Sequence, residues 1–340
     1  MFDVAGPSPD AQAIVLACSS LGLPPRDEVK PFGPRGWARL HAAIEASALG
    51  APGALHGLTA AEIEAALRID ASDATRLATL LTRSGQLAFE LDRLQSRGIW
   101  VTTLVDETYP PVLRERLGPD SPPLLFGSGD RRALRAGGVA VVGSRDADAD
   151  ALAFTERLAT AAAAAGTAIV SGGARGIDQE AMRAAFARGG LVVGVLPEGV
   201  ERRIRDSATR TAVSNGQAVL VSPYHPAAGF SAGAAMARNK LIYALADVAV
   251  VVSSGVGSGG TWAGALEALE AGWVPIFVRD DPVAPEGNRE LLRRGGVPLA
   301  PHSIGPTLTA GNLVQAASSR PRQVAETATG YGQASLWDVD

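Results

Sequence analysis

The stretch Val139-Ala-Val-Val-Gly-Ser-Arg145 combines a short run of apolar residues with an abrupt Gly-Ser-Arg end. Such a run is typical of a buried strand that leads into an anion-binding turn. Two later stretches of this 340-residue chain, 168–178 and 248–261, repeat the pattern of apolar run, Gly and Ser, and then a helix-like segment. Turns of this kind leave a parallel sheet at its carboxyl edge, where glycine lets backbone N–H groups approach a ligand. We therefore expect one crevice that binds an anion, most simply a phosphate.

Strands and helices alternate from Val139 onward. This spacing is typical of βαβ units with right-handed crossovers, and it predicts an α/β fold with a doubly wound, Rossmann-like parallel sheet. A strand at 99–104, a short helix at 109–117 and an extended segment at 122–126 lead into it. The expected strands of the sheet lie near 139–142, 167–170, 191–196, 218–222, 248–252 and 274–278, with a last helix at 288–294.

The chain divides into three parts. Residues 1–96 are expected to form a small helical domain, in which no helix shows a basic face, so both a docking role and a DNA-binding role stay open. Residues 97–300 are expected to form an extended Rossmann-like domain. Residues 301–340 are rich in Ser, Thr, Pro, Gly and Gln, which predicts a disordered tail that ends in Leu336-Trp-Asp-Val-Asp340. The helices of the first part are expected at 11–21, 37–48, 60–69 and 74–95, with a break near Ser84-Gly85.

Composition narrows the function classes. A net charge of −4 gives no global attraction to nucleic acid, so such binding must come from a local cluster of Lys and Arg. The four histidines are scattered without Cys or carboxylate at ligand spacing, so neither a metal site nor a cofactor is expected. The apolar runs are too short to span a bilayer and no secretory signal is recognisable, which favours a cytoplasmic protein without a membrane partner.

Cations stand at three of the expected strand exits or helix starts. Arg145 is expected in the first turn of a helix, beside Gly143 and Ser144, where a guanidinium can hold a phosphate with two hydrogen bonds. Arg175 lies in the second turn. A further helix is expected to begin at Ala237, which places Arg238, Asn239 and Lys240 at its start.

In these motifs the chain resembles the DNA-processing protein A family (DprA, also called Smf). The resemblance runs from about Ile99 to Ala300. It implies an extended Rossmann-like fold, a homodimer, single-stranded DNA held in a basic pocket, and loading of the RecA recombinase during natural transformation, by a binding protein without catalytic residues. The motifs are Tyr109-Pro110, Pro122-Pro123, Gly143-Ser-Arg145, 171–178 (Ser-Gly-Gly-Ala-Arg-Gly-Ile-Asp), Arg238-Asn-Lys240 and the Gly-Thr turn that ends at Thr261.

The family pocket maps onto Ser144, Arg145, Arg175, Arg238, Asn239 and Lys240. Three features depart from the family: a longer spacer between Phe230 and Arg238, a last turn that reads Gly-Gly-Thr-Trp262, and the lack of a recognisable winged helix. Together with the Gly-rich turns, the full set of expected DNA- or phosphate-binding residues is Gly143, Ser144, Arg145, Ser171, Gly172, Gly173, Arg175, Arg238, Asn239, Lys240, Ser258, Gly259, Gly260 and Thr261.

Two other functions compete. Residues 255–260, followed by Asp280, fit a dinucleotide fingerprint, but only one further strand is expected after them, which argues against NAD. The Gly-Gly-Thr turn is also similar to that of nucleoside 5′-monophosphate phosphoribohydrolases, whose acid closely follows the turn. Here residues 262–266 are Trp, Ala, Gly, Ala and Leu, which leaves Glu267 and Asp178 as candidate carboxylates. Apolar stretches at 266–269 and 274–278 are candidates for the dimer contact.

Overall fold

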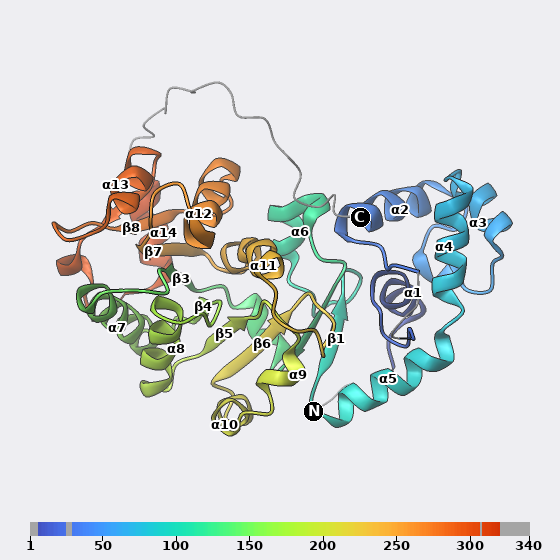
Figure 1. Cartoon of the computed structure of the whole chain (residues 1–340), viewed down its shortest axis with the longest axis horizontal. Helices are drawn as coiled ribbons and strands as arrows, with labels where there is room; N and C mark the ends of the chain where they lie inside the picture. Colours follow the sequence, from blue (N-terminus) through green and yellow to red (C-terminus); the bar gives the residue numbers. More distant parts are fainter. Residues whose placement is uncertain (1–5, 25–28, 307, 320–340) are drawn as a thin grey trace.

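The computed structural model describes residues 6–24, 29–306 and 308–319. Figure 1 shows the N-terminal helices gathered at one end of the molecule and a sheet with helices on both faces that makes up the remainder. The predicted α/β class is therefore confirmed, and so is a sheet whose strands are mostly parallel. The expected Leu336-Trp-Asp-Val-Asp340 end of the chain lies outside the described residues.

The N-terminal helices form a cluster with its own apolar centre. The expected break in the last helical stretch is confirmed, because α4 ends at Leu81 and Arg83 precedes the start of α5. Thr59 and Glu62 form the capping box of α3. The elements of this part are α1 (Pro9–Cys18), α2 (Pro34–Ala46), η1 (Pro52–Leu55), α3 (Ala60–Leu67), α4 (Ala71–Leu81) and α5 (Ser84–Ser96).

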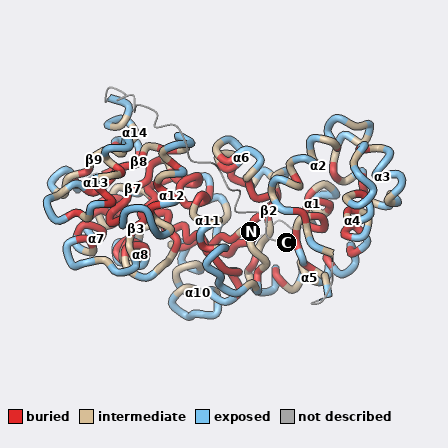
Figure 2. Tube along the Cα trace, turned by 45° about the horizontal axis from the view of Figure 1, so that its top comes forward, coloured by how far each residue is buried: buried red, intermediate tan, exposed pale blue. Residues whose placement is uncertain are grey.

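The apolar centre of these helices continues into the sheet. Trp37 and Leu77 of the helices belong to one buried cluster with Leu124, Phe126 and Leu220 of the strands. Figure 2 shows α1 beside β2, with buried residues in both. The helical part and the sheet are therefore packed against each other rather than joined only by a linker.

A nine-stranded sheet has the order β1-β2-β6-β5-β4-β3-β7-β8-β9. Strand β2 pairs antiparallel with both β1 and β6, and the remaining pairs are parallel. The strands are β1 (Trp100–Thr103), β2 (Leu124–Ser128), β3 (Val139–Gly143), β4 (Ile169–Ser171), β5 (Val192–Val195), β6 (Ala218–Ser222), β7 (Val248–Ser253), β8 (Ile276–Arg279) and β9 (Val297–Leu299).

Strand β3 is the point at which the strand order reverses. The chain steps from β3 to β4, β5 and β6 on one side, then returns through α11 to place β7 on the other side of β3. In open α/β sheets the ligand crevice lies outside the carboxyl ends of the strands at such a reversal. The exits of β3, β4 and β7 are therefore the place to look for a site.

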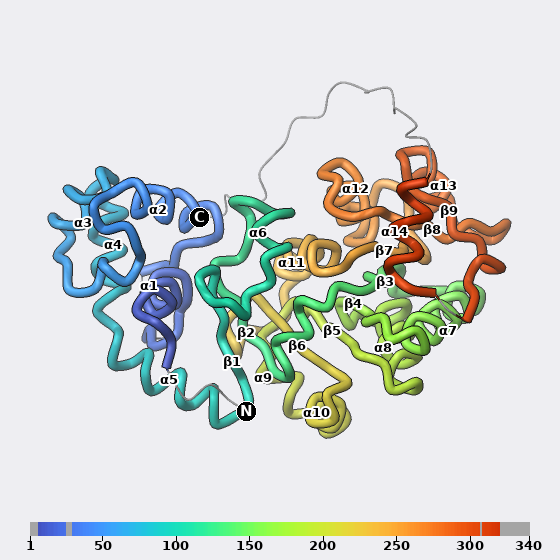
Figure 3. Tube along the Cα trace, turned by 180° about the vertical axis from the view of Figure 1, so that it is seen from behind, coloured from blue at the N-terminus to red at the C-terminus, as the bar shows by residue number. Residues whose placement is uncertain are grey.

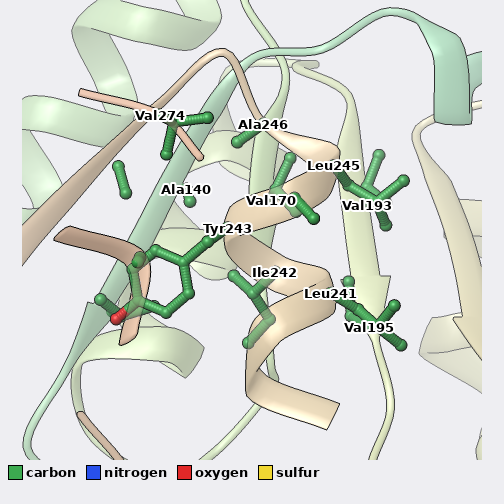
Figure 4. Close-up of a cluster of buried hydrophobic side chains, with 14 of the residues drawn as sticks. Ala140, Val170, Val193, Val195, Leu241, Ile242, Tyr243, Leu245, Ala246 and Val274 are labelled. Carbon is green, nitrogen blue, oxygen red and sulfur yellow. The ribbon is translucent and has the colours of Figure 1, made fainter. Parts of the chain in front are cut away.

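Helices cover both faces of the sheet. On one face Leu241, Ile242 and Leu245 of α11 pack on Val170 and Val193, as Figure 4 shows. On the other face α7, α8 and α14 supply the apolar side chains, and Figure 3 shows α14 on that side. The remaining elements are α6 (Pro111–Leu117), η2 (Gly118–Asp120), η3 (Arg131–Arg135), α7 (Ala149–Ala164), α8 (Ile177–Ala187), α9 (Val200–Arg203), α10 (Ser207–Ser214), α11 (Ala232–Leu245), α12 (Gly259–Ala271), α13 (Glu286–Arg293), η4 (Pro301–Ser303) and α14 (Ala310–Ser318).

Three expectations differ from the structure near the end of the sheet. The tail expected from residue 301 is wrong for 301–306 and 308–319, because Ile304, Leu308 and Leu313 are buried against the sheet and α14 follows. A few apolar residues at helical spacing are enough to dock this segment, although its composition is polar. Strands β8 and β9 both follow β7, so the expectation of one further strand is also wrong. The stretch 274–278 is buried within the chain, so it presents no free face to a second copy.

Candidate nucleic-acid interface

The first turn of the crevice begins at Gly143, the last residue of β3. A Cβ at this position would lie 2.5 Å from Cγ1 of Ile177, so only glycine lets α8 pack here. The hydroxyl of Ser144 accepts a hydrogen bond from the Asp146 backbone N–H at 3.1 Å and thereby shapes the turn. Arg145 is exposed to solvent in the loop that follows.

The expected place of Arg145 in the first turn of a helix is wrong. Helix α7 begins only at Ala149, with the Asp148 side chain accepting from the backbone N–H of Ala151. Aspartate is a strong N-cap and thus sets a later start. The guanidinium of Arg145 therefore extends from a loop rather than from a helix end, which leaves it free to adjust to a ligand.

The second turn is closed on itself by Asp178. The Ser171 hydroxyl donates to the Val141 carbonyl at 2.8 Å, and Ser171 is fully buried. The backbone N–H groups of Gly172 and Ala174 donate to Oδ2 of Asp178 at 3.1 and 3.4 Å. These N–H donors, which we expected to face a phosphate, are already occupied. Gly173, with a φ of +68°, supplies the left-handed turn between them.

A buried guanidinium lies directly over this turn. Arg238 of α11 is 4% exposed, and a Cβ at Gly172 would collide with its Nη1. Its Nε and Nη1 have no hydrogen-bond partner in the described part of the chain. Burial lowers the pKa of Arg238 to about 10, against the opposing charge of Asp178, so the group is still a cation at neutral pH. A buried cation with unused donors is the feature that most directly indicates an anion-binding site.

Asp178 faces this arginine. Burial raises the pKa of the Asp178 carboxyl to about 6, and the Arg238 charge opposes the shift. Its place at a strand-end turn before a helix predicts that Asp178 caps that helix or orients Arg175. Instead it holds the second turn and faces Arg238, while Arg175 forms an exposed ion pair with Asp146.

Helix α11 separates the three residues of the Arg-Asn-Lys motif. Successive helix residues point about 100° apart, so Arg238 and Lys240 lie on nearly opposite sides of it. The Asn239 side chain donates to the Gly260 carbonyl at 3.1 Å. The ammonium of Lys240 lies 4.0 Å from Glu267 and is largely buried. The structure thus brings Arg238 to the crevice and Asn239 to the third turn, but it does not bring Lys240 to either.

The expected helix start at Ala237 is the source of that error. Helix α11 begins at Ala232, where the Ser231 hydroxyl accepts from the Ala234 backbone N–H at 3.1 Å. The motif therefore lies in the middle of the helix, where successive side chains point in different directions around the helix axis. At a helix start, by contrast, all three residues would have bordered the same turn.

The third turn follows β7. The Thr261 hydroxyl donates to the Gly143 carbonyl at 3.1 Å and ties this turn to the exit of β3. Ser258 and Gly259 are exposed at the start of α12, and Gly259 has a φ of +86°. Gly260 is close to Asn239. The three turns expected to converge are therefore in contact.

A shallow depression of about 530 Å³ adjoins the first two turns. It is lined by Arg145 and Arg175 together with Arg183 of α8. Arg183, which the sequence analysis did not select, also forms ion pairs with Glu180 at 2.6 Å and Glu156 at 3.0 Å. The sequence could have indicated Arg183, because it lies near the start of α8, the helix that follows the second Gly-rich turn.

A buried carboxylate at the exit of β5 was also missed. Glu198 is 6% exposed, its charge acts on Arg238, and it binds Arg203 at 2.8 Å. Pro197-Glu198-Gly199 follows an apolar strand, which is the same signal that identified the other turns. The carboxyl edge therefore also holds the ion pair of Glu198 and Arg203, whose carboxylate acts on Arg238.

The candidate acid of a hydrolase, Glu267, does not contact any of these groups. Glu267 lies beside Lys240, and burial raises the pKa of its carboxyl. Over the described ranges there is no group of three or more His, Cys, Asp or Glu side chains able to hold a metal ion. Within the same ranges, no helix is long and apolar enough to cross a bilayer.

Comparison with known proteins gives consistent matches. Residues 100–300 match the family model described as DNA recombination-mediator protein A. A protein of Mycobacterium tuberculosis named as a DNA processing protein DprA is 32% identical over 284 residues, which is 74% of this chain and 71% of that relative.

Two solved structures share the fold. DprA of Streptococcus pneumoniae superposes with a TM-score of 0.64 at 21% identity, over 80% of this chain and 93% of that one. The DNA processing protein A of Helicobacter pylori, whose structure was described for its mode of binding single-stranded DNA, gives a TM-score of 0.51 at 24% identity, over 65% and 96% of the two chains. The span of the family match and the identity to the mycobacterial relative lead to one conclusion: this chain is a member of the DNA recombination-mediator protein A (DprA) family.

Proposed function

We propose that this protein binds single-stranded DNA, without base specificity, in the crevice at the carboxyl edge of its sheet. The observation that carries the proposal is the buried Arg238 guanidinium, which keeps two unused donors over Gly172. A phosphate oxygen would satisfy those donors and compensate the charge. Exposed Arg145 and Arg175 at the neighbouring turns would hold adjacent phosphates.

A binding role suits this geometry better than catalysis. Cleavage of an N-glycosidic bond requires a carboxylate placed against the ribose. Asp178 is buried and accepts two backbone hydrogen bonds, and Glu267 lies beside Lys240. Incubation with nucleoside monophosphates should therefore release no free base, as followed by chromatography. Release that is lost in Glu267→Ala or Asp178→Ala would favour the hydrolase instead.

The direct test is a titration of fluorescent oligonucleotides, single and double stranded, at two salt concentrations. We expect tighter binding of the single strand, little dependence on base sequence, and a steep loss of affinity with salt. Arg238→Gln should weaken binding of all sequences alike. Arg132→Gln is the matched control, because Arg132 is an exposed arginine in η3, which precedes β3 at the opposite edge of the sheet. Equal affinity of the wild type and the Arg238 variant would contradict the proposal.

Family membership supports two further proposals, a partner recombinase of the RecA type and a homodimer. Filament assembly by purified RecA on single-stranded DNA, with and without this protein, tests the first; an unchanged assembly rate would count against it. Light scattering at micromolar concentration, with and without DNA, tests the second, and monomer mass in both conditions would reject it. A dimer would join two crevices and increase avidity without new contacts.

A further inference from the structure

Helix α5 and its C-cap residue Arg97 carry an aromatic and two cations along one side. Phe89, Arg93 and Arg97 follow one another at four-residue spacing, which places them on one side of a helix. Leu87 and Leu94 lie on the other side, buried among the N-terminal helices. Phe89 is 80% exposed, which is unusual for so large an apolar side chain.

Helix α9 completes this surface from the sheet side. The buried carboxylate of Glu201 is 3.3 Å from Arg93, contacts Arg97, and is 4.0 Å from Arg205. Arg93 also pairs with Glu90 at 2.8 Å. The guanidiniums of Arg93, Arg97 and Arg205 are thus gathered around the Glu201 carboxylate, and those of Arg97 and Arg205 are substantially exposed to solvent. We call Phe89, Arg93, Arg97 and Arg205 the α5–α9 surface; Figures 1 and 3 both show the C-terminal end of α5 next to α9.

This gathering of arginines could not be expected from the α5 sequence, in which Arg93 is flanked by Glu90 and Asp92. The cluster of three arginines arises only because Glu201, 108 residues from Arg93 in the chain, holds Arg205 at the same place. Charge patterning within one helix could not show it.

The α5–α9 surface is linked to the crevice by the loop that follows β6. The Tyr224 hydroxyl donates to the Ala234 carbonyl of α11 at 2.8 Å, and the backbone N–H of Glu201 donates to the Pro226 carbonyl at 3.0 Å. A second link runs from Arg238 through Glu198 to Arg203, which follows Glu201 on α9. A strand that leaves the crevice along this edge therefore meets the α5–α9 surface next.

We propose that the α5–α9 surface is a second contact site for single-stranded nucleic acid, in which Phe89 stacks on a base and Arg93, Arg97 and Arg205 bind the flanking phosphates. This inference rests on the proposed function of the crevice and extends it. An exposed aromatic ring among arginines suits unpaired bases, since every base has a stacking face, whereas a duplex keeps its bases stacked inside. A protein partner fits less well, because Phe89 is the only large apolar side chain exposed on α5 and its neighbours are charged.

The test uses the full chain and single-stranded oligonucleotides of increasing length. Short oligonucleotides that fill only the crevice should bind wild type and Phe89→Ala equally. Above a threshold length the wild type should gain affinity, and Phe89→Ala should bind about tenfold more weakly, the order expected for one lost stacking contact. Phe89→Trp should keep the gain of the wild type, and its added fluorescence should fall when long oligonucleotides bind. The same titration with Arg97→Ala tests the phosphate contacts, and Arg132→Ala is its matched control.

Several outcomes would overturn the inference. Equal affinity of wild type and Phe89→Ala at every length would do so, and so would an equal loss at every length, which would indicate a disturbed crevice. A change in self-association without a change in DNA binding would assign Phe89 to a contact between copies. Failure of the crevice itself is distinguishable: Arg238→Gln would then leave affinity for short oligonucleotides unchanged, while a Phe89-dependent gain with length would keep the α5–α9 surface.

Discussion

A buried carboxylate organises arginines in two regions of this molecule, with opposite results. In the crevice the arginine is buried together with the carboxylate, and Arg238 keeps donors that Asp178 does not use. At the α5–α9 surface the carboxylate of Glu201 is the buried partner, and the arginines around it extend into solvent. A desolvated cation binds a phosphate strongly at short range, whereas exposed cations give attraction that salt screens. The crevice is therefore suited to hold a DNA strand, and the α5–α9 surface is suited to guide it.

Loss of the buried Arg238 guanidinium should weaken DNA binding more than any other change. We expect Arg238→Gln to weaken single-stranded DNA binding about 10- to 100-fold, since hydrogen bonds to charged groups contribute about 1.5–3 kcal/mol. Fluorescence anisotropy at 0.1 M salt measures this. A loss no greater than that of Arg97→Ala would contradict the distinction between the two regions.

Displacement of the Arg238 guanidinium without removal of its charge should weaken DNA binding less. The Cβ of Gly172→Ala collides with Nη1 of Arg238, and this mobile end can move aside. We expect roughly tenfold weaker binding with an almost unchanged melting temperature. The measurement pairs anisotropy with thermal unfolding, and Gly305→Ala, at an exposed position where the added Cβ has no atom within 4 Å, controls for the effect of an added methyl group. A large fall in melting temperature together with wild-type affinity would show that Arg238 is structural.

Salt dependence should separate Arg145 from Lys240. Loss of an exposed phosphate contact in Arg145→Ala should lower the slope of log affinity against log salt by about one. Lys240→Ala should leave the slope unchanged, because the Lys240 ammonium lies beside Glu267 away from the crevice. Equal slopes for the two variants would show that α11 presents its motif differently in the DNA complex.

Mild acid should tighten binding by a few-fold. As pH falls through about 6, Asp178 takes up a proton and no longer compensates Arg238. The raised pKa also means that the contribution of Asp178 to stability is fully present below pH 4 and is lost as pH rises through 6. Asp178→Asn should remove the pH dependence of both quantities between pH 5 and 7.5. Anisotropy and denaturant unfolding at several pH values measure them, and an unchanged pH profile in the variant would rule out Asp178 as the cause.

The sequence predicted the strands from β3 to β8 and the convergence of the turns after β3, β4 and β7, because each of these turns is marked locally by an apolar run followed by Gly and Ser, but it missed β9. It did not predict that Lys240 lies apart from Arg238, since that depends on where α11 begins. Nor did it predict the α5–α9 surface, since Arg93 and Glu201 meet only through the packing of two distant segments. Helix α14 was missed because its few buried side chains, Leu313 among them, lie in a polar composition.

The apolar cluster that spans the N-terminal helices and the sheet has a consequence for how the chain folds. Leu124, Phe126 and Leu220 belong to the strands, yet the helices before residue 97 shield them from water. A fragment that begins at β1 would expose this apolar face at the antiparallel end of its sheet, where unpaired edges invite self-association. Helices and strands that share a core should therefore gain and lose structure together, in one cooperative transition rather than two.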